Sequence, residues 1–199
     1  MNYLAHFHLA GKKQGHIVGA LLGDFVKGPM TGITLPDDIK QGILLHRRID
    51  SFTDQHPAIL SLGRTLPCDV HRFKSILTDL FFDYALAKHW DSFCDEHIEH
   101  YEQRVHATLD LHRDHYDSRA LQMVDRLQRH QLLANYSERE VLDGIIVNIG
   151  KRLRRSDQMQ AGAEAMWKMK EEWEAAFLGI YPQLQQFAEM EISKFETTD

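Results

Sequence analysis

The sequence has few cysteines, few prolines and no long apolar run. Its only cysteines, Cys68 and Cys94, are too few for a cysteine-rich zinc site or a disulfide framework. No apolar run approaches the roughly 18 residues that a membrane-spanning helix needs, and the opening residues lack the pattern of a secretory signal. These absences predict a cytoplasmic protein without a membrane partner.

Basic residues are also in the minority. Lys and Arg number 23 against 29 Asp and Glu, which gives a formal net charge of −6. A net-acidic chain binds nucleic acid only through a local basic patch, so we expect no nucleic-acid partner. With 43% hydrophobic and 26% charged residues, the composition is that of a globular protein.

The chain has only 5 prolines and no alternating β-branched runs, and apolar residues recur at helical intervals. We therefore predict an all-α fold, a compact helical bundle forming one domain over residues 1–199. Helices are expected over residues 2–10, 15–27, 36–54, 69–94, 96–114, 117–133 and 137–149. Pro182 is expected to interrupt or kink the last helical segment.

Histidine is abundant, with 13 residues, of which 12 lie at or before His115. A local excess of histidine favours a metal or acid–base site, although those from His97 to His115 are expected on a solvated helical face. His46 and Asp50 lie four residues apart and Asp54 another four, so their side chains share one face of a helix. They can bind a divalent cation together, or His46 can simply pair with Asp50.

A second pair of carboxylates lies within an apolar helix. Asp79 and Asp83 are four residues apart, and two buried carboxylates on one face require a positive group between them. That group can be a metal ion, or Arg47 or Arg48 from a neighbouring helix. The pattern leaves both alternatives open.

Glycine leaves one helix face bare around Asp24. Gly15, Gly19 and Gly23 are spaced by four residues, which predicts the close approach of a neighbouring helix. Asp24 beside this stripe is a candidate metal ligand or a counter-ion for an arginine. His6 near the start is a further candidate, or a hydrogen-bonded core histidine. We predict that Asp24, His46, Asp50 and Asp79 converge on one pocket.

The only dense basic cluster is Lys151-Arg152-Leu153-Arg154-Arg155. It can be a solvated helix end, where cations suit the helix dipole, or a surface that attracts phosphate groups or an acidic partner.

Four segments together resemble the acyl carrier protein phosphodiesterases. They are Met1-Asn2-Tyr3-Leu4-Ala5-His6-Phe7-His8-Leu9, Gly19 to Gly28, His46-Arg47-Arg48-Ile49-Asp50 with Thr53-Asp54, and Asp79 to Trp90. Their order and spacing match over essentially the whole chain. The resemblance implies an HD-domain-like helical fold and hydrolysis of the phosphodiester that joins 4′-phosphopantetheine to holo acyl carrier protein. It also implies a requirement for Mn²⁺, or Mg²⁺.

The candidate residues fit the roles that such a reaction requires. As metal ligands we expect Asp24, His46, Asp79 and Asp83, and as catalytic residues His6, Arg47, Arg48, Asp50 and Asp54, with the two arginines contacting phosphate. For docking of the acidic carrier protein we expect Lys151, Arg152, Arg154 and Arg155. Two other functions remain open: an HD-type hydrolase of a nucleotide or another small phosphoester, and a non-catalytic helical protein that binds a metal or a partner.

Overall fold

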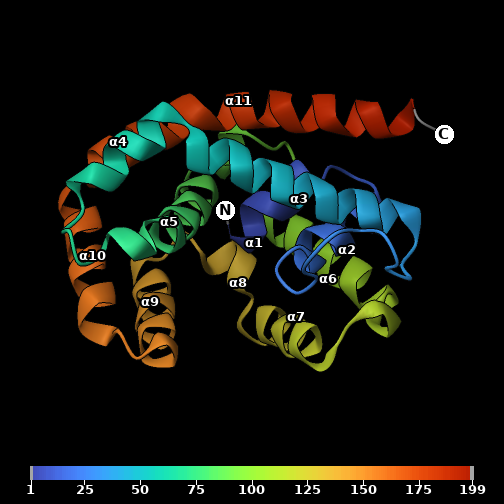
Figure 1. Cartoon of the computed structure of the whole chain (residues 1–199), viewed down its shortest axis with the longest axis horizontal. Helices are drawn as coiled ribbons and strands as arrows, with labels where there is room; N and C mark the ends of the chain where they lie inside the picture. The colour runs from blue at the N-terminus through green and yellow to red at the C-terminus, as the bar shows by residue number, and fades with distance from the viewer. Residues whose placement is uncertain (1, 198–199) are drawn as a thin grey trace.

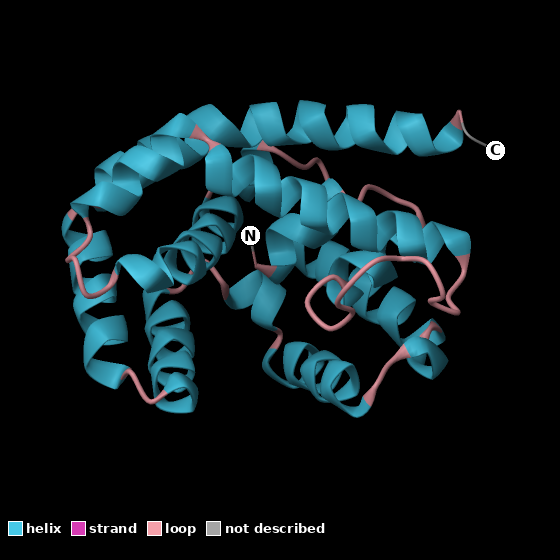
Figure 2. Ribbon diagram, in the orientation of Figure 1, coloured by secondary structure: helices cyan, strands magenta, loops and turns pink. Residues whose placement is uncertain are grey.

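Helices and their connecting loops make up the protein, described over residues 2–197 by a computed structural model, and no strand occurs within that range (Figure 2). This confirms the all-α prediction. The α-helices are α1 (Tyr3–Leu9), α2 (Gln14–Leu22), α3 (Asp37–Gln55), α4 (Pro57–Thr65), α5 (Lys74–Lys88), α6 (Ile98–Leu111), α7 (Ser118–His130), α8 (Leu132–Asn135), α9 (Arg139–Leu153), α10 (Ser156–Lys168) and α11 (Lys170–Glu196). None of the described helices combines the length and apolar character needed to cross a bilayer.

The short helix α1 lies in the middle of the molecule, where it packs against α2, α5 and α11 (Figure 1). Nearly all of its side chains are buried, including Leu4 and Phe7. Helix α5 is also apolar on most of its surface, and Phe81 and Phe82 on adjacent positions are both fully buried. The burial of these two helices explains how polar groups on them are brought into the core.

The predicted close approach at the glycine stripe is confirmed, and it joins α2 to α3. A Cβ atom at Gly19 would lie 2.4 Å from the carbonyl oxygen of Ile39, closer than any real contact allows. A Cβ at Gly23 would lie 2.3 Å from Cγ of the His46 ring. The absence of side chains on this face therefore lets α3 approach α2 and leaves room for His46.

Several predicted boundaries are wrong. The helix expected over 69–94 is a 3₁₀ turn (His71–Phe73), α5 and a second 3₁₀ turn (Trp90–Ser92). The helix expected over 15–27 ends at Leu22, so Asp24 lies in the turn that follows. Pro182 does not interrupt α11, which runs from Lys170 to Glu196 as one helix, and the alternative of a kink at Pro182 stays a prediction.

Candidate active site

Two helices, α1 and α3, bring two histidines and one carboxylate together. His6 on α1 and His46 on α3 are buried, and their rings stack with centroids 3.8 Å apart and an interplanar angle of 12°. Asp50, one turn after His46, lies 3.0 Å from His6 Nε2 through Oδ1 and 3.2 Å from His46 Nε2 through Oδ2. The ligand atoms of these three residues lie within 4.8 Å of one another, a grouping that can hold a metal ion.

The backbone fixes the orientation of the His46 ring. His46 Nδ1 lies 2.8 Å from the carbonyl oxygen of Ala20, which accepts only, so Nδ1 carries a proton and donates. In the neutral ring Nε2 is then an acceptor, and it faces an oxygen of Asp50. Two acceptors at 3.2 Å are stabilised by a proton or a cation between them.

The electrostatics of the cluster favour a neutral His6 and an ionised Asp50. Burial, together with the adjacent His46, lowers the pKa of His6 to about 3. Although burial opposes ionisation, the contacts with His46 and His6 hold the pKa of Asp50 well below its usual range. A neutral imidazole and a carboxylate are the forms in which these side chains bind metals.

Two further carboxyl groups flank the cluster. Asp24 Oδ1 lies 3.8 Å from His46 Nε2, and the charge of Asp24 contributes to the raised pKa of Tyr3. Burial raises the pKa of Asp79 on α5, and the charges of Asp50 and Asp54 raise it further. Asp24 and Asp79 both line a cavity of about 760 Å³, whose wall is also formed by apolar side chains of α5, α7 and α9.

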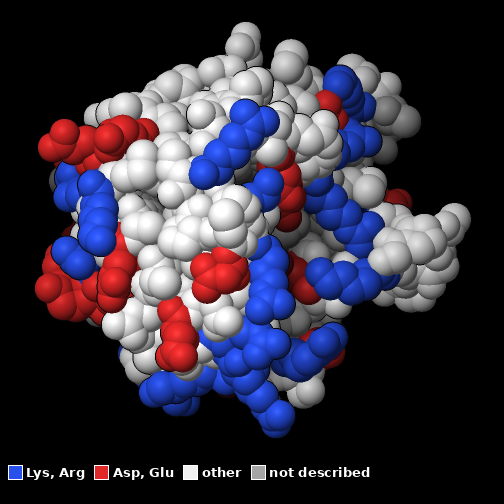
Figure 3. Space-filling model, turned by 60° about the vertical axis from the view of Figure 1, so that its left-hand side comes forward, with Lys and Arg blue, Asp and Glu red and all other residues white. Residues whose placement is uncertain are grey.

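The structure therefore brings together His6, Asp24, His46, Asp50 and Asp79. Asp54 is more distant from the histidines and accepts a hydrogen bond from the Ser75 hydroxyl at 3.2 Å. On the face that Figure 3 shows, basic side chains gather along a hollow that has acidic side chains inside it.

Asp83 lies outside this group, and its role as a metal ligand stays a prediction. It is fully buried, and its two oxygens accept the backbone N–H groups of Leu4 and Ala5 at 2.9 and 3.0 Å. These donors have no partner within α1 because they belong to its first turn. Asp83 thus holds the start of the helix that carries His6.

Arg47 and Arg48 also contact other segments of the protein, and their contact with phosphate stays a prediction. Arg47 donates to the carbonyl oxygens of Gly28 and Val26 at 2.7 and 2.8 Å, and so anchors the loop after α2. Arg48 pairs with Glu191 of α11, and its guanidinium lies 5.3 Å from the centre of the Phe195 ring. Both arginines hold neighbouring segments in place.

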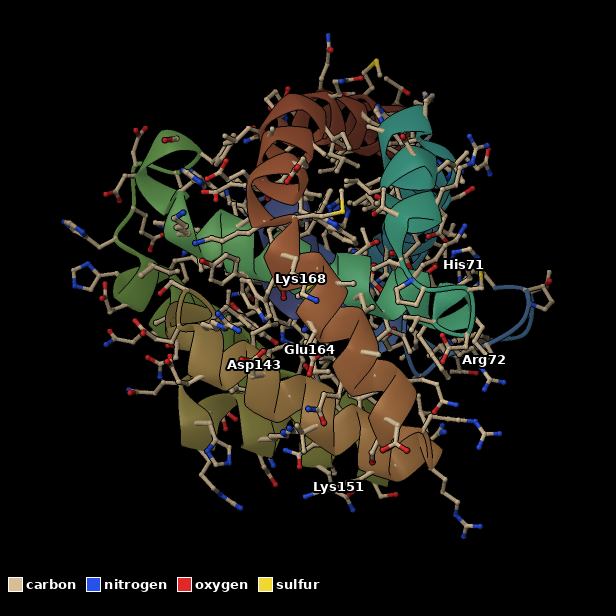
Figure 4. All side chains as sticks on the ribbon, turned by 90° about the vertical axis from the view of Figure 1, so that its left-hand side faces the viewer. His71, Arg72, Asp143, Lys151, Glu164 and Lys168 are labelled. Carbon is tan, nitrogen blue, oxygen red and sulfur yellow. The ribbon has the colours of Figure 1, made fainter. Side chains whose placement is uncertain are left out.

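The basic segment spans the last turn of α9 and the turn that leads to α10. Lys151, Arg152, Arg154 and Arg155 are all exposed, and Arg154 adopts the left-handed conformation with φ of 55°. Figure 4 shows Lys151 at the lower end of this helix pair, away from the labelled Asp143, Glu164 and Lys168. Arg152 differs from the others because it lines the cavity.

The cavity also contains residues that the motifs did not indicate. Arg119 and Arg126 of α7, together with Tyr136, line it beside Asp24 and Asp79. Helix α7 alternates polar and apolar residues like any surface helix, so no local signal distinguishes its arginines. A cavity that gathers titratable groups from several helices next to a buried histidine–aspartate cluster defines this protein as a helical enzyme.

Comparison with known protein families identifies the family of this enzyme. The model described as acyl carrier protein phosphodiesterase matches residues 1–184, and the chain belongs to this family of phosphodiester hydrolases.

The curated relatives agree. A protein of Yersinia pestis named acyl carrier protein phosphodiesterase is 28% identical over 95% of this chain and 98% of its own length. A relative of the same name from Klebsiella pneumoniae is 29% identical, again over 95% of this chain and 98% of its own. No solved structure matches the chain significantly.

Proposed function

We propose that this protein hydrolyses the phosphodiester between 4′-phosphopantetheine and a serine of holo acyl carrier protein. The products are the apo carrier protein and free 4′-phosphopantetheine. The observation that carries the proposal is the His6–His46–Asp50 cluster beside a deep cavity, in a chain that matches the family over residues 1–184. The relatives named above bear the name of the same activity.

A divalent metal ion, Mn²⁺ in preference to Mg²⁺, fits the cluster. The ligand atoms of His6, His46 and Asp50 lie within 4.8 Å of one another, close enough for one ion to contact all three. A bound cation would also supply positive charge between His46 Nε2 and Asp50. Two imidazoles with a carboxylate suit Mn²⁺ better than Mg²⁺, which prefers oxygen ligands. His6, His46 and Asp50 would hold the ion, with Asp24 beside them.

When bound, such an ion supplies a Lewis acid for the phosphoryl oxygens and lowers the pKa of water. In the reaction, a water oxygen attacks phosphorus, the bond from phosphorus to the serine oxygen breaks, and that oxygen takes up a proton. Asp79 lines the cavity and retains its proton more strongly than an ordinary aspartate does. It is therefore the wall residue suited to protonate the leaving serine oxygen.

The basic turn between α9 and α10 provides a docking surface for the carrier protein. Lys151, Arg154 and Arg155 are exposed and close to Arg152 at the cavity. A positive turn beside the cavity attracts an acidic protein and orients its prosthetic group toward the cluster.

Intact-mass measurement of the carrier protein tests the function. After incubation of the protein with holo carrier protein and Mn²⁺, the carrier should lose the mass of phosphopantetheine. Treatment with a chelator should prevent this loss, and renewed Mn²⁺ should restore it. An unchanged carrier mass with every divalent metal would refute the activity, whereas loss of mass after chelation would refute only the metal requirement.

A further inference from the structure

The cavity is lined by three arginines that do not belong to the His6–His46–Asp50 cluster. Arg119 and Arg126 of α7 and Arg152 of α9 line it. Arg119 donates two hydrogen bonds to Asp117, at 3.0 and 3.2 Å. Among the described residues, Arg126 and Arg152 form neither an ion pair nor a hydrogen bond. Arg126 is nevertheless half-buried, so its charge is partly removed from water without a protein partner.

Both unpaired arginines act on tyrosines that line the cavity. Burial raises the pKa of Tyr3, and the charge of Arg152 opposes that rise. Burial likewise raises the pKa of Tyr136, and Arg126 opposes it. Asn2, also on the cavity wall, donates to the Tyr136 hydroxyl at 2.8 Å. Both arginines and both tyrosines thus line the same cavity.

This region is connected to the histidine cluster through described contacts. Tyr3 and Asp24 line the cavity together, and Asp24 lies 3.8 Å from His46. An anion held by Arg126 and Arg152 would thus lie in the same cavity as Asp24 and Asp79. Guanidinium groups match phosphate oxygens in geometry and charge, and a half-buried arginine without a partner is suited to a bound anion.

We propose that Arg126 and Arg152 bind the phosphoryl group of the substrate and then the phosphate of the released product. The inference rests on the proposed function and adds the residues that recognise its phosphate. Cleavage turns a diester with one negative charge into a monoester with a charge of about −1.5 to −2 at neutral pH. The same arginines therefore bind the product more tightly than the substrate, and 4′-phosphopantetheine inhibits the enzyme.

Calorimetric titration with inorganic phosphate and with 4′-phosphopantetheine tests the site without any turnover. Arg126→Gln and Arg152→Gln should each weaken binding of both anions about tenfold or more, the usual loss for a charged hydrogen bond. Arg129→Gln is the matched control, because Arg129 is an exposed residue of the same helix that does not line the cavity. It should bind both anions within twofold of the wild type.

Arg126→Lys tests the same point in a variant that keeps the charge. It should retain helix content by circular dichroism and recover part of the affinity lost in Arg126→Gln. Equal phosphate affinity in the wild type, Arg126→Gln and Arg152→Gln would overturn the proposal.

Kinetics separate phosphate binding from docking of the carrier protein. With bis(4-nitrophenyl) phosphate, which has no protein portion, the two Gln variants should lose kcat/KM by about tenfold as they do with holo carrier protein. A loss confined to holo carrier protein would overturn the proposal in favour of a docking role. Because the titrations need no hydrolysis, a wild type that binds phosphate through Arg126 but leaves holo carrier protein intact would refute the proposed function alone.

Discussion

His46 is the residue on which the proposed site depends most. It stacks on His6, contacts Asp50 and Asp24, and is oriented by the Ala20 carbonyl. We expect His46→Ala to lower kcat by at least about 100-fold and to weaken Mn²⁺ binding, since it removes a proposed metal ligand. Helix content by circular dichroism should be retained.

His100→Ala is the control for this prediction, because His100 is exposed on α6 and lies outside the cluster. It should keep wild-type activity and Mn²⁺ affinity. Full activity of His46→Ala would exclude His46 from the chemistry.

Asp83 makes stability depend on pH. Burial raises its pKa to about 7, more than the two backbone N–H donors lower it. Between about pH 4 and pH 7 the folded state therefore holds a proton that the unfolded state has released, and the unfolding free energy falls as pH rises. Relative to that of Asp83→Asn, the unfolding free energy of the wild type should fall by up to about 4 kcal/mol over this range. Above about pH 7 the difference should stay constant. Urea unfolding at several pH values measures the difference, and a difference independent of pH would contradict the shifted pKa.

Residue spacing predicted that His46 and Asp50 lie together. It did not reveal what Arg47, Arg48 and Asp83 contact. His46 and Asp50 are four apart on α3 and do lie together. Arg47 and Arg48 follow His46 directly, and residues one or two apart on a helix face different directions. Helical geometry alone thus argues against their sharing the face of His46. The backbone donors that engage Asp83 belong to α1, far away in sequence, and no spacing within α5 reveals them.

At the scale of elements, the contact between α2 and α3 sets the position of His46. Gly23→Ala would place a Cβ 2.3 Å from the His46 ring, so the ring or the helix must move. We expect destabilisation of about 1–3 kcal/mol, as for other overpacked cores, with a loss of kcat of tenfold or more. Thermal unfolding and carrier hydrolysis measure the two effects.

Gly144→Ala is the comparison, because a Cβ at Gly144 within α9 meets nothing within 4 Å. The gain in helix propensity should stabilise this variant by up to about 1 kcal/mol, with unchanged activity. Wild-type kcat and Mn²⁺ affinity in Gly23→Ala would contradict the prediction, because the His46 ring would then tolerate the added Cβ.

Periodicity predicted which segments are helical more reliably than where each helix stops. The apolar pattern of α5 continues to Trp90, but Trp90 Nε1 donates to the Glu96 carbonyl oxygen at 2.6 Å, within a turn. His56-Pro57 ends α3 as expected and also begins α4, with His56 Nδ1 accepting from Ala58 N–H. Proline suits the first turn of a helix, so one signal marks both an end and a start.

At the scale of the whole molecule, the charged turn and the cavity act on one large substrate. Combined Lys151→Gln, Arg154→Asn and Arg155→Gln changes should raise KM for holo carrier protein severalfold in dilute buffer and flatten its salt dependence. Asn is chosen at Arg154 because it tolerates the left-handed conformation. kcat should change little, since exposed charges mainly affect encounter.

Lys168→Gln is the control for the docking prediction, because Lys168 is exposed at the other end of α10. It should leave KM unchanged. A severe fall in kcat of the triple variant at saturating substrate would place the turn within the active site instead.

The cavity itself could not be predicted from the sequence. It forms where α5, α7 and α9 meet the start of α1 and the turn after α2, and these contacts join residues far apart in the chain. Arg126 lines the cavity only because α7 packs at that position. Motif analysis locates groups that share one helix, whereas the residues around a substrate are determined by tertiary packing.

Anomalous diffraction from crystals soaked in Mn²⁺ tests the proposed metal centre most directly. We expect an anomalous peak in contact with His6 Nε2, His46 Nε2 and the Asp50 carboxylate, and the loss of that peak in His46→Ala crystals. A peak bound elsewhere, with none at these three side chains in an enzyme that requires Mn²⁺, would contradict the assignment.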